Sequence, residues 1–312
     1  MVNGKASFAR LFTFSIFHFP FAILVLSGCH LPQHTGPTTQ PYVGPTQSMS
    51  EVIAAINENN HKLPTLWAHA NSIDVSIVSE KGKRHDEVLS GNVLYRAPSD
   101  VSLVGDKDIL GQVVQIGSNR DIYWLSIKKV DPDTAWWGRY KYLGSDCAKP
   151  IPVRPDLVLQ VLGVSTINMD FTALPAPVMR FNNDRDEYML TWVAPAPARD
   201  RWVAVREIWY DRQTKRPTHV MLYDLDGRVQ LSGWLARHKP VEVADLPKDK
   251  WPTVATDYRL YFPETGSKLH LSLDDVRLSR KGAPNDKSFG FTPTPKGAGV
   301  SKVIQLDEDC GP

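Results

Sequence analysis

The sequence has few of the groups that most often carry covalent chemistry. It holds three cysteines in 312 residues, and its nine histidines show no H-E-x-x-H or H-x-H spacing. It contains no G-x-S-x-G, Walker A or C-x-x-C motif. The acid pairs Asp131/Asp133, Asp184/Asp186 and Asp224/Asp226 stand in turn-like stretches, where aspartate ordinarily bonds nearby backbone amides. We therefore predict that the protein is not an enzyme and uses neither a metal nor a cofactor; a degradative enzyme with a turn carboxylate such as Asp131 is the outside alternative.

An excess of either charge is also absent. The chain has 36 Lys and Arg against 34 Asp and Glu, a net charge of +2, and residues 1–28 contribute two bases and no acid. Without those residues the side chains sum to about zero. A neutral balance argues against nucleic acid as a partner, and it gives no polybasic attraction to a membrane beyond that of a lipid anchor. We expect no nucleic-acid partner.

A long, unbroken apolar run is missing from the beginning of the chain. Residues 11–26 are mostly Phe, Leu, Ile and Val, but His18 and Pro20 interrupt them, and the run is shorter than the roughly 20 residues of a spanning helix. Lys5 and Arg10 precede it and no acid does, which is typical of a secretory signal peptide. The run closes on Leu26-Ser27-Gly28-Cys29, which resembles the lipobox of bacterial lipoproteins, although a plain signal peptide with a chance cysteine is the alternative.

The lipobox resemblance implies cleavage after Gly28 and lipid attachment at Cys29. More than one acyl chain, at about 0.8 kcal/mol per buried CH₂, anchors a protein stably. His30 follows the cysteine where an inner-membrane lipoprotein of enteric bacteria often has Asp, so we expect the periplasmic face of the outer membrane. We divide the chain into a signal peptide (1–28), a Pro/Thr-rich tether (29–47) and one domain (48–312).

Lipidation of Cys29 would leave Cys147 and Cys310 as an even pair in an oxidising compartment. We predict a disulfide between them, which would tie the end of the chain to its middle. The alternative is two unrelated thiols, because spacing alone does not supply the geometry that a disulfide needs.

Alternating apolar residues dominate the domain. Short stretches rich in β-branched and aromatic residues, each closed by Gly, Pro, Asn or Asp, run from about residue 73 to 130 and again from about 178 to 305. A capping box at Ser48 and Glu51 predicts a helix over about 50–60, and Arg154-Pro155-Asp156 begins a second short helix that stops at Gly163. The pattern predicts a mainly β (α+β) fold: one large curved antiparallel sheet with helices packed against one face.

Four stretches resemble the LolA/LolB lipoprotein-carrier superfamily in their order. They are SEVIAAINEN, LSGNVLYRAPSDVSLVG, REIWYDRQTKRPTHVMLYDLDGRV and SFGFTPTPKGAGVSKVIQL, which together span about residues 48–308. The resemblance implies an unclosed β-barrel whose helices sit on its concave face over a cavity for acyl chains. The chain departs from the family in its extra residues around 131–150 and 180–202.

Six apolar residues are candidates to line such a cavity, with plain core as the alternative: Val52, Ile53, Ile56, Val93, Tyr95 and Leu103. Trp136 and Trp137, expected in a polar loop, are candidates for contact with a membrane or partner, because indoles favour interfaces; the alternative is that both fold into the sheet. The resulting hypothesis is a lipid-anchored envelope protein that binds lipid or lipoprotein acyl chains, in lipoprotein sorting or outer-membrane maintenance. A non-catalytic scaffold with a filled cavity, binding other envelope proteins, is the second hypothesis.

Overall fold

The computed structural model describes residues 44–78, 82–107, 111–128, 132–145, 147–196, 200–279 and 284–311. The predicted signal peptide, Cys29 and most of the tether lie outside the described residues. Tyr42–Pro312 forms one compact unit. Among the described residues, none of the helices has both the length and the apolar character needed to cross a bilayer.

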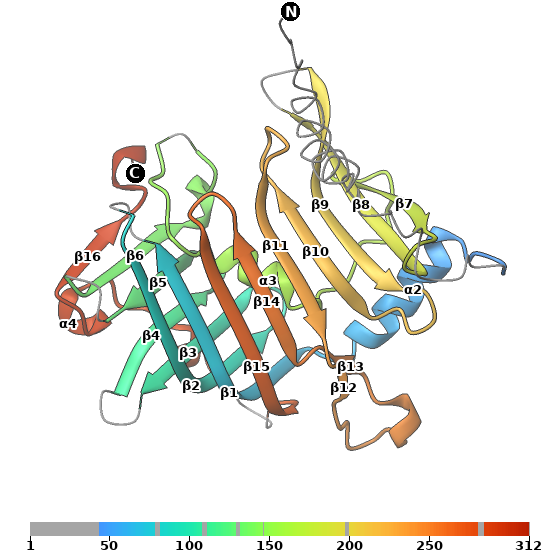
Figure 1. Cartoon of the computed structure of the whole chain (residues 1–312), viewed down its shortest axis with the longest axis horizontal. Helices are drawn as coiled ribbons and strands as arrows, with labels where there is room; N and C mark the ends of the chain where they lie inside the picture. Colours follow the sequence, from blue (N-terminus) through green and yellow to red (C-terminus); the bar gives the residue numbers. More distant parts are fainter. Residues whose placement is uncertain are drawn as a thin grey trace, which may run out of the picture. The chain divides into compact units, whose positions relative to one another are not determined.

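The domain is built mainly from strands, as its alternating sequence predicts (Figure 1). The strands are β1 (Thr65–Val78), β2 (Arg84–Arg96), β3 (Asp100–Lys107), β4 (Gly111–Ser118), β5 (Ile122–Ile127), β6 (Thr134–Arg139), β7 (Ala176–Asn182), β8 (Glu187–Ala196), β9 (Arg201–Asp211), β10 (Pro217–Tyr223), β11 (Val229–Ala236), β12 (Lys239–Pro240), β13 (Thr253–Val254), β14 (Asp257–Phe262), β15 (Ser267–Arg277) and β16 (Lys302–Gln305). The α-helices are α2 (Met49–Asn60), α3 (Pro155–Val161) and α4 (Pro295–Ala298), and short 3₁₀ turns are η1 (Tyr140–Tyr142), η2 (Lys248–Lys250), η3 (Asp286–Phe289) and η4 (Glu308–Cys310).

One sheet of 14 strands carries the fold. Its order is β16-β6-β5-β4-β3-β2-β1-β15-β14-β11-β10-β9-β8-β7, and β12 pairs with β13 in a separate ribbon. The edge strands β16 and β7 do not pair with each other, so the curved sheet stays open, and the predicted fold class is confirmed. One difference from the expected pattern is that β16 runs parallel to β6, whereas all other neighbouring strands in the described sheet are antiparallel.

The helices form where their sequence signals predict. Ser48 caps α2: its side chain accepts from Glu51 N–H, and the Glu51 carboxylate accepts from Ser48 N–H at 2.8 Å. Pro155 opens α3, and the chain leaves it at Gly163, whose φ of +72° favours glycine. Both helices place their apolar residues in the same hydrophobic core as the inner face of the sheet.

The hairpin chemistry also follows the sequence. Asp224 and Gly227 join β10 to β11: the Asp224 side chain accepts from the N–H groups of Asp226 and Arg228, and Gly227 has a φ of +81°. Trp136 and Trp137 are placed differently from the prediction. They belong to β6, where they pair with Leu125 and Trp124 of β5, and both are partly buried. Their expected position in a loop is therefore wrong, because β5 and β16 flank this short segment and supply its backbone hydrogen bonds.

Candidate functional site

The six predicted cavity residues lie together inside the domain. They are between 0 and 5% exposed and belong to one core cluster: Val52, Ile53, Ile56, Val93, Tyr95 and Leu103. Val93 and Leu103 are directly paired between β2 and β3, and Tyr95 follows on the same face. The sequence pattern thus identified residues of the inner face; that they touch a ligand stays a prediction.

A hollow of about 230 Å³ opens at the margin of this core. Val75, Ile77, Val114 and Ile127 form its apolar wall, and each is at most 4% exposed. These residues come from β1, β4 and β5, so strands that are not neighbours in the sheet line the same space. Polar and charged side chains from β2 and from the residue after β5 complete it: Arg84, His85, Asp86, Glu87 and Lys128. An apolar wall with polar groups at its margin is the arrangement of a site for an apolar ligand.

The alternating sequence indicates the strands that line this hollow, but it gives no sign of the hollow itself. Val75 and Ile77 stood out by their alternation, and Val114 and Ile127 lie in stretches with the same period. The signal that they share a site is the curvature of the sheet, which brings β4 and β5 opposite β1. A period of two reports the face on which a residue lies and gives no information on curvature.

Polar side chains hold α2 in place over the core. Asn57 is 7% exposed; its Nδ2 donates to Ile167 O at 2.8 Å, and its Oδ1 accepts from Ile167 N–H at 2.7 Å. Asn60 donates to Ser165 O at 2.8 Å. On the other side of the helix, Asn59 makes the same two-way bond with the backbone of Thr253, at 3.0 and 2.7 Å. These asparagines attach α2 to the segment after α3 and to β13 without any covalent link.

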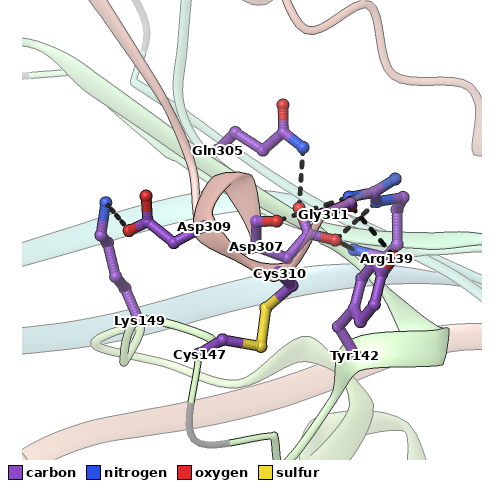
Figure 2. Close-up of a disulfide and its surroundings, with 9 residues drawn as sticks. All are labelled: Arg139, Tyr142, Cys147, Lys149, Gln305, Asp307, Asp309, Cys310 and Gly311. Carbon is purple, nitrogen blue, oxygen red and sulfur yellow. Dashed lines mark hydrogen bonds and ion pairs between the residues drawn. A yellow bond between two sulfur atoms is a disulfide. The ribbon is translucent and has the colours of Figure 1, made fainter.

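The end of the chain is fixed more firmly (Figure 2). Cys147 and Cys310, the pair that the sequence analysis matched, are joined by a disulfide with a Cα–Cα distance of 5.3 Å. Beside it, Arg139 Nε donates to Asp307 Oδ2 at 2.7 Å, and Gln305 Nε2 donates to Asp307 Oδ1 at 2.9 Å. Burial alone would raise the pKa of Asp307, but the hydrogen bonds from Arg139 and Gln305 outweigh it and lower the pKa.

A second, larger groove of about 1260 Å³ lies on the opposite face of the sheet. Its exposed apolar residues are Val88, Trp234 and Tyr261, at 68, 45 and 38% exposure. His270 and charged residues of both signs share its surface: Asp74, Arg84, Asp86, Glu87, Asp257, Arg259 and Lys268. A third, polar hollow of about 570 Å³ lies near Arg96, Asp100 and Asp286. None of the six predicted cavity residues lines any of these three hollows.

At the larger groove, which we call the outer groove, a serine, an aspartate and a histidine lie together. Their order does not suit nucleophilic catalysis. His270 Nδ1 lies 3.0 Å from Asp74 Oδ2, and Ser72 Oγ donates to the other oxygen of Asp74. The carboxylate therefore stands between the hydroxyl and the imidazole. In a nucleophilic triad the imidazole must contact the hydroxyl to take its proton, so this arrangement does not activate Ser72.

Burial shifts the pKa of three other groups in the direction that favours their neutral form. Burial raises the pKa of both Tyr123 and Tyr140 to about 12, and it lowers the pKa of His238 to about 4. Among the described residues, no three His, Cys, Asp or Glu side chains are grouped so that they could hold a metal ion. The chemistry that the described site offers is burial of apolar surface beside fixed charges.

No protein-family model matches the sequence, and no curated protein matches it. Solved structures with a similar fold include a LolA superfamily protein from Nitrosomonas europaea, with 13% identity and a TM-score of 0.44 over 78% of this chain and 98% of that one. A putative outer membrane lipoprotein-sorting protein domain from Vibrio parahaemolyticus has 13% identity and a TM-score of 0.44 over 77% of this chain and 95% of that one. A DUF1329 family protein from Desulfovibrio piger has 14% identity and a TM-score of 0.46 over 78% and 98% of the two chains.

Proposed function

We propose that this protein is a lipid-anchored protein of the bacterial envelope that binds an apolar ligand, a lipid or the acyl chains of a lipoprotein, on the concave face of its open sheet. The mechanism is burial of alkyl chains, each CH₂ contributing about 0.8 kcal/mol, and no covalent step is required. Cys29 would carry the lipid anchor. His30, the residue after it, fits a location at the periplasmic face of the outer membrane.

The observation that carries the proposal is the hollow between β1, β4 and β5. Its wall is made of core residues, yet it opens at the margin of the sheet beside Glu87 and Lys128. At about 230 Å³ it is smaller than the roughly 300–1,000 Å³ of ordinary ligand sites. An acyl chain would therefore have to enlarge the hollow as it enters.

The test is photochemical labelling of the full chain in phosphatidylcholine vesicles with a 16-carbon chain that carries a terminal diazirine. We expect crosslinks on peptides of β1, β4 and β5. Ile127→Phe, which narrows the hollow, should reduce them severalfold. Val88→Phe is the matched control, because it adds the same ring to the outer face and should leave labelling unchanged.

The second candidate function is a scaffold that binds other envelope proteins. The observation in its favour is that the six predicted cavity residues are packed into one continuous core, while the outer groove exposes Trp234 and Tyr261. Labelling that is absent from the inner strands, or that Ile127→Phe does not reduce, would contradict ligand binding and leave this candidate as the better account.

A further inference from the structure

Arg206 lies on the inner face of the sheet and is partly buried. In β9 it pairs with Trp192 of β8 on one side and with Leu222 of β10 on the other, and these neighbours are 3% and 2% exposed. A register shift between β8 and β9 at Trp192/Val193 marks a β-bulge next to it. Arg206 therefore shares the inner face with Ile208 and Tyr210, which are both buried.

Three other partly buried arginines each hold a carboxylate. Arg96 pairs with Asp100, Arg139 with Asp307 at 2.7 Å, and Arg154 with Asp156 at 2.7 Å.

Arg206 lacks such a partner: in the part of the chain that the structure describes, no acid lies within ion-pair distance of it and no hydrogen bond is made by its guanidinium. The adjacent Glu207 is engaged elsewhere, by Thr191 at 3.1 Å and Trp209 Nε1 at 2.6 Å.

The contact that Arg206 does make leaves its donors available. Its guanidinium carbon lies 3.9 Å from the centre of the Trp192 ring. Stacking of this kind uses the face of the cation and leaves the N–H groups at its edge, which match a carboxylate or a phosphate in two-pronged hydrogen bonds. Burial lowers the pKa of Arg206, but an arginine remains charged at neutral pH. A partly buried charge without a counter-charge is unfavourable unless a ligand supplies one.

We infer that Arg206 binds the anionic group of the ligand, so that the ligand is an amphiphile whose carboxylate or phosphate pairs with this guanidinium while its chain lies on the inner face. This inference rests on the proposed function, since it assumes that an apolar ligand occupies that face. The inference adds to the proposed function that the ligand has an anionic head group and that Arg206 selects it.

The experiment uses three photoreactive probes of equal chain length with the full chain in phosphatidylcholine vesicles at alkaline pH. The probes are a fatty acid, a lysophosphatidic acid and the neutral fatty alcohol. We expect the wild-type protein to be labelled by at least one anionic probe about tenfold more than by the alcohol, the discrimination of one charge-assisted hydrogen bond. Preference for the acid would identify a carboxylate, and preference for the lyso-lipid a phosphate.

Two variants make the result specific to Arg206. Arg206→Met keeps the length and the contact with Trp192 and should label with all three probes at the level of the alcohol. Arg180→Met is the matched control, because Arg180 is exposed on the opposite face of the neighbouring β7–β8 pair, and it should behave as wild type. In ligand-free protein, Arg206→Met should unfold at the same temperature as wild type or a higher one, because it removes an uncompensated charge.

The outcomes separate the two proposals. Equal labelling of wild type by the acid, the lyso-lipid and the alcohol would overturn the anionic head group and leave apolar-ligand binding intact. A lower melting temperature for Arg206→Met together with unchanged probe preference would assign Arg206 a structural role and overturn the inference. Failure of every probe to label the inner strands would overturn the proposed function itself.

Discussion

The two halves of the sheet are held by different kinds of interaction. In the half that contains β1–β6 and β16, which we call the α3 half, α3 packs on β3, β4 and β5, and the end of the chain is fixed by a disulfide and the Arg139–Asp307 pair. The half that contains β7–β11, which we call the α2 half, lies beside α2, where Gln47 N–H donates to Tyr188 OH of β8 (Figure 1). Asparagine side chains attach this helix to the segment after α3 and to β13, and Arg206 of β9 lacks an acidic partner among the described residues.

The difference separates a fixed wall, which is the α3 half with the end of the chain, from a movable wall, which is helix α2. Covalent and buried ionic links resist opening, whereas neutral side-chain hydrogen bonds contribute about 1 kcal/mol each and exchange readily with water. A ligand that enters the concave face would therefore displace α2 more easily than the end of the chain. The following predictions test this contrast, beginning with the largest expected effect.

Removing the disulfide should destabilise the α3 half most. Its cysteines are 163 residues apart, and closing a loop of this length in the unfolded chain is worth about 5 kcal/mol in the chain-entropy model. The Cys147→Ser/Cys310→Ser double variant should lose most of that free energy in urea unfolding. Tyr142→Phe, which removes the hydrogen bond from Tyr142 OH to Gly311 O at 3.1 Å and leaves the disulfide in place, is the control and should change little. A loss below about 1 kcal/mol in the double variant would mean that the covalent link does not set the stability of this half.

Asp307→Asn should destabilise the same half by a smaller amount. The side chains of Asp307 and Arg139 are 1% and 26% exposed, and the substitution leaves Arg139 without its counter-charge, at a cost of about 3 kcal/mol. Because the folded protein lowers the pKa of Asp307, the wild type holds this stabilisation above the unfolded value of about 3.9 and loses it as pH falls through the folded value.

The measurement is the free energy of unfolding between about pH 2 and 6, in the window set by that unfolded pKa. As the pH falls, the free energy of unfolding of the variant should decrease less than that of the wild type, because the contribution of Asp307 is missing. A decline as steep as that of the wild type would show that other carboxylates produce it.

Asn57→Ala should loosen the attachment of α2 and cause the smallest of the three losses in the free energy of unfolding. It leaves the buried N–H and C=O of Ile167 without their side-chain partner, which costs about 2 kcal/mol. Hydrogen exchange at the amides of residues 162–168 should accelerate, while the amides of β6 and β16 keep wild-type protection. Glu58→Ala is the control, since its side chain is 70% exposed and its pair with Lys62 lies on the surface. Equal acceleration in both halves would contradict the separation into a fixed and a movable wall.

The structure explains why some site residues were predictable and others were not. Val52, Ile53 and Ile56 follow a helical period and Val93, Tyr95 and Leu103 a strand period, so the inner face was visible in the sequence. The place of Arg206 on the inner face was not visible in this way, because the alternation changes beside it. Val203 and Val205 stand at odd positions, whereas Ile208 and Tyr210 stand at even positions. The bulge in the β8–β9 pairing changes the phase and places Arg206 on the inner face; that break in the alternation is the signal that could have found it.

The sequence by itself determined the elements: the capping box of α2, Pro155 at the start of α3, the strand periods and their turns. These depend on residues close together in the chain, whose steric and hydrogen-bonding preferences act locally. Only the tertiary structure decided that β16 joins β6 in parallel, that Trp136 and Trp137 lie in a strand, and that β4 and β5 face β1 across a hollow. Such features depend on pairings between distant segments, and the free energy of those pairings is set by curvature, register and burial that no local pattern encodes.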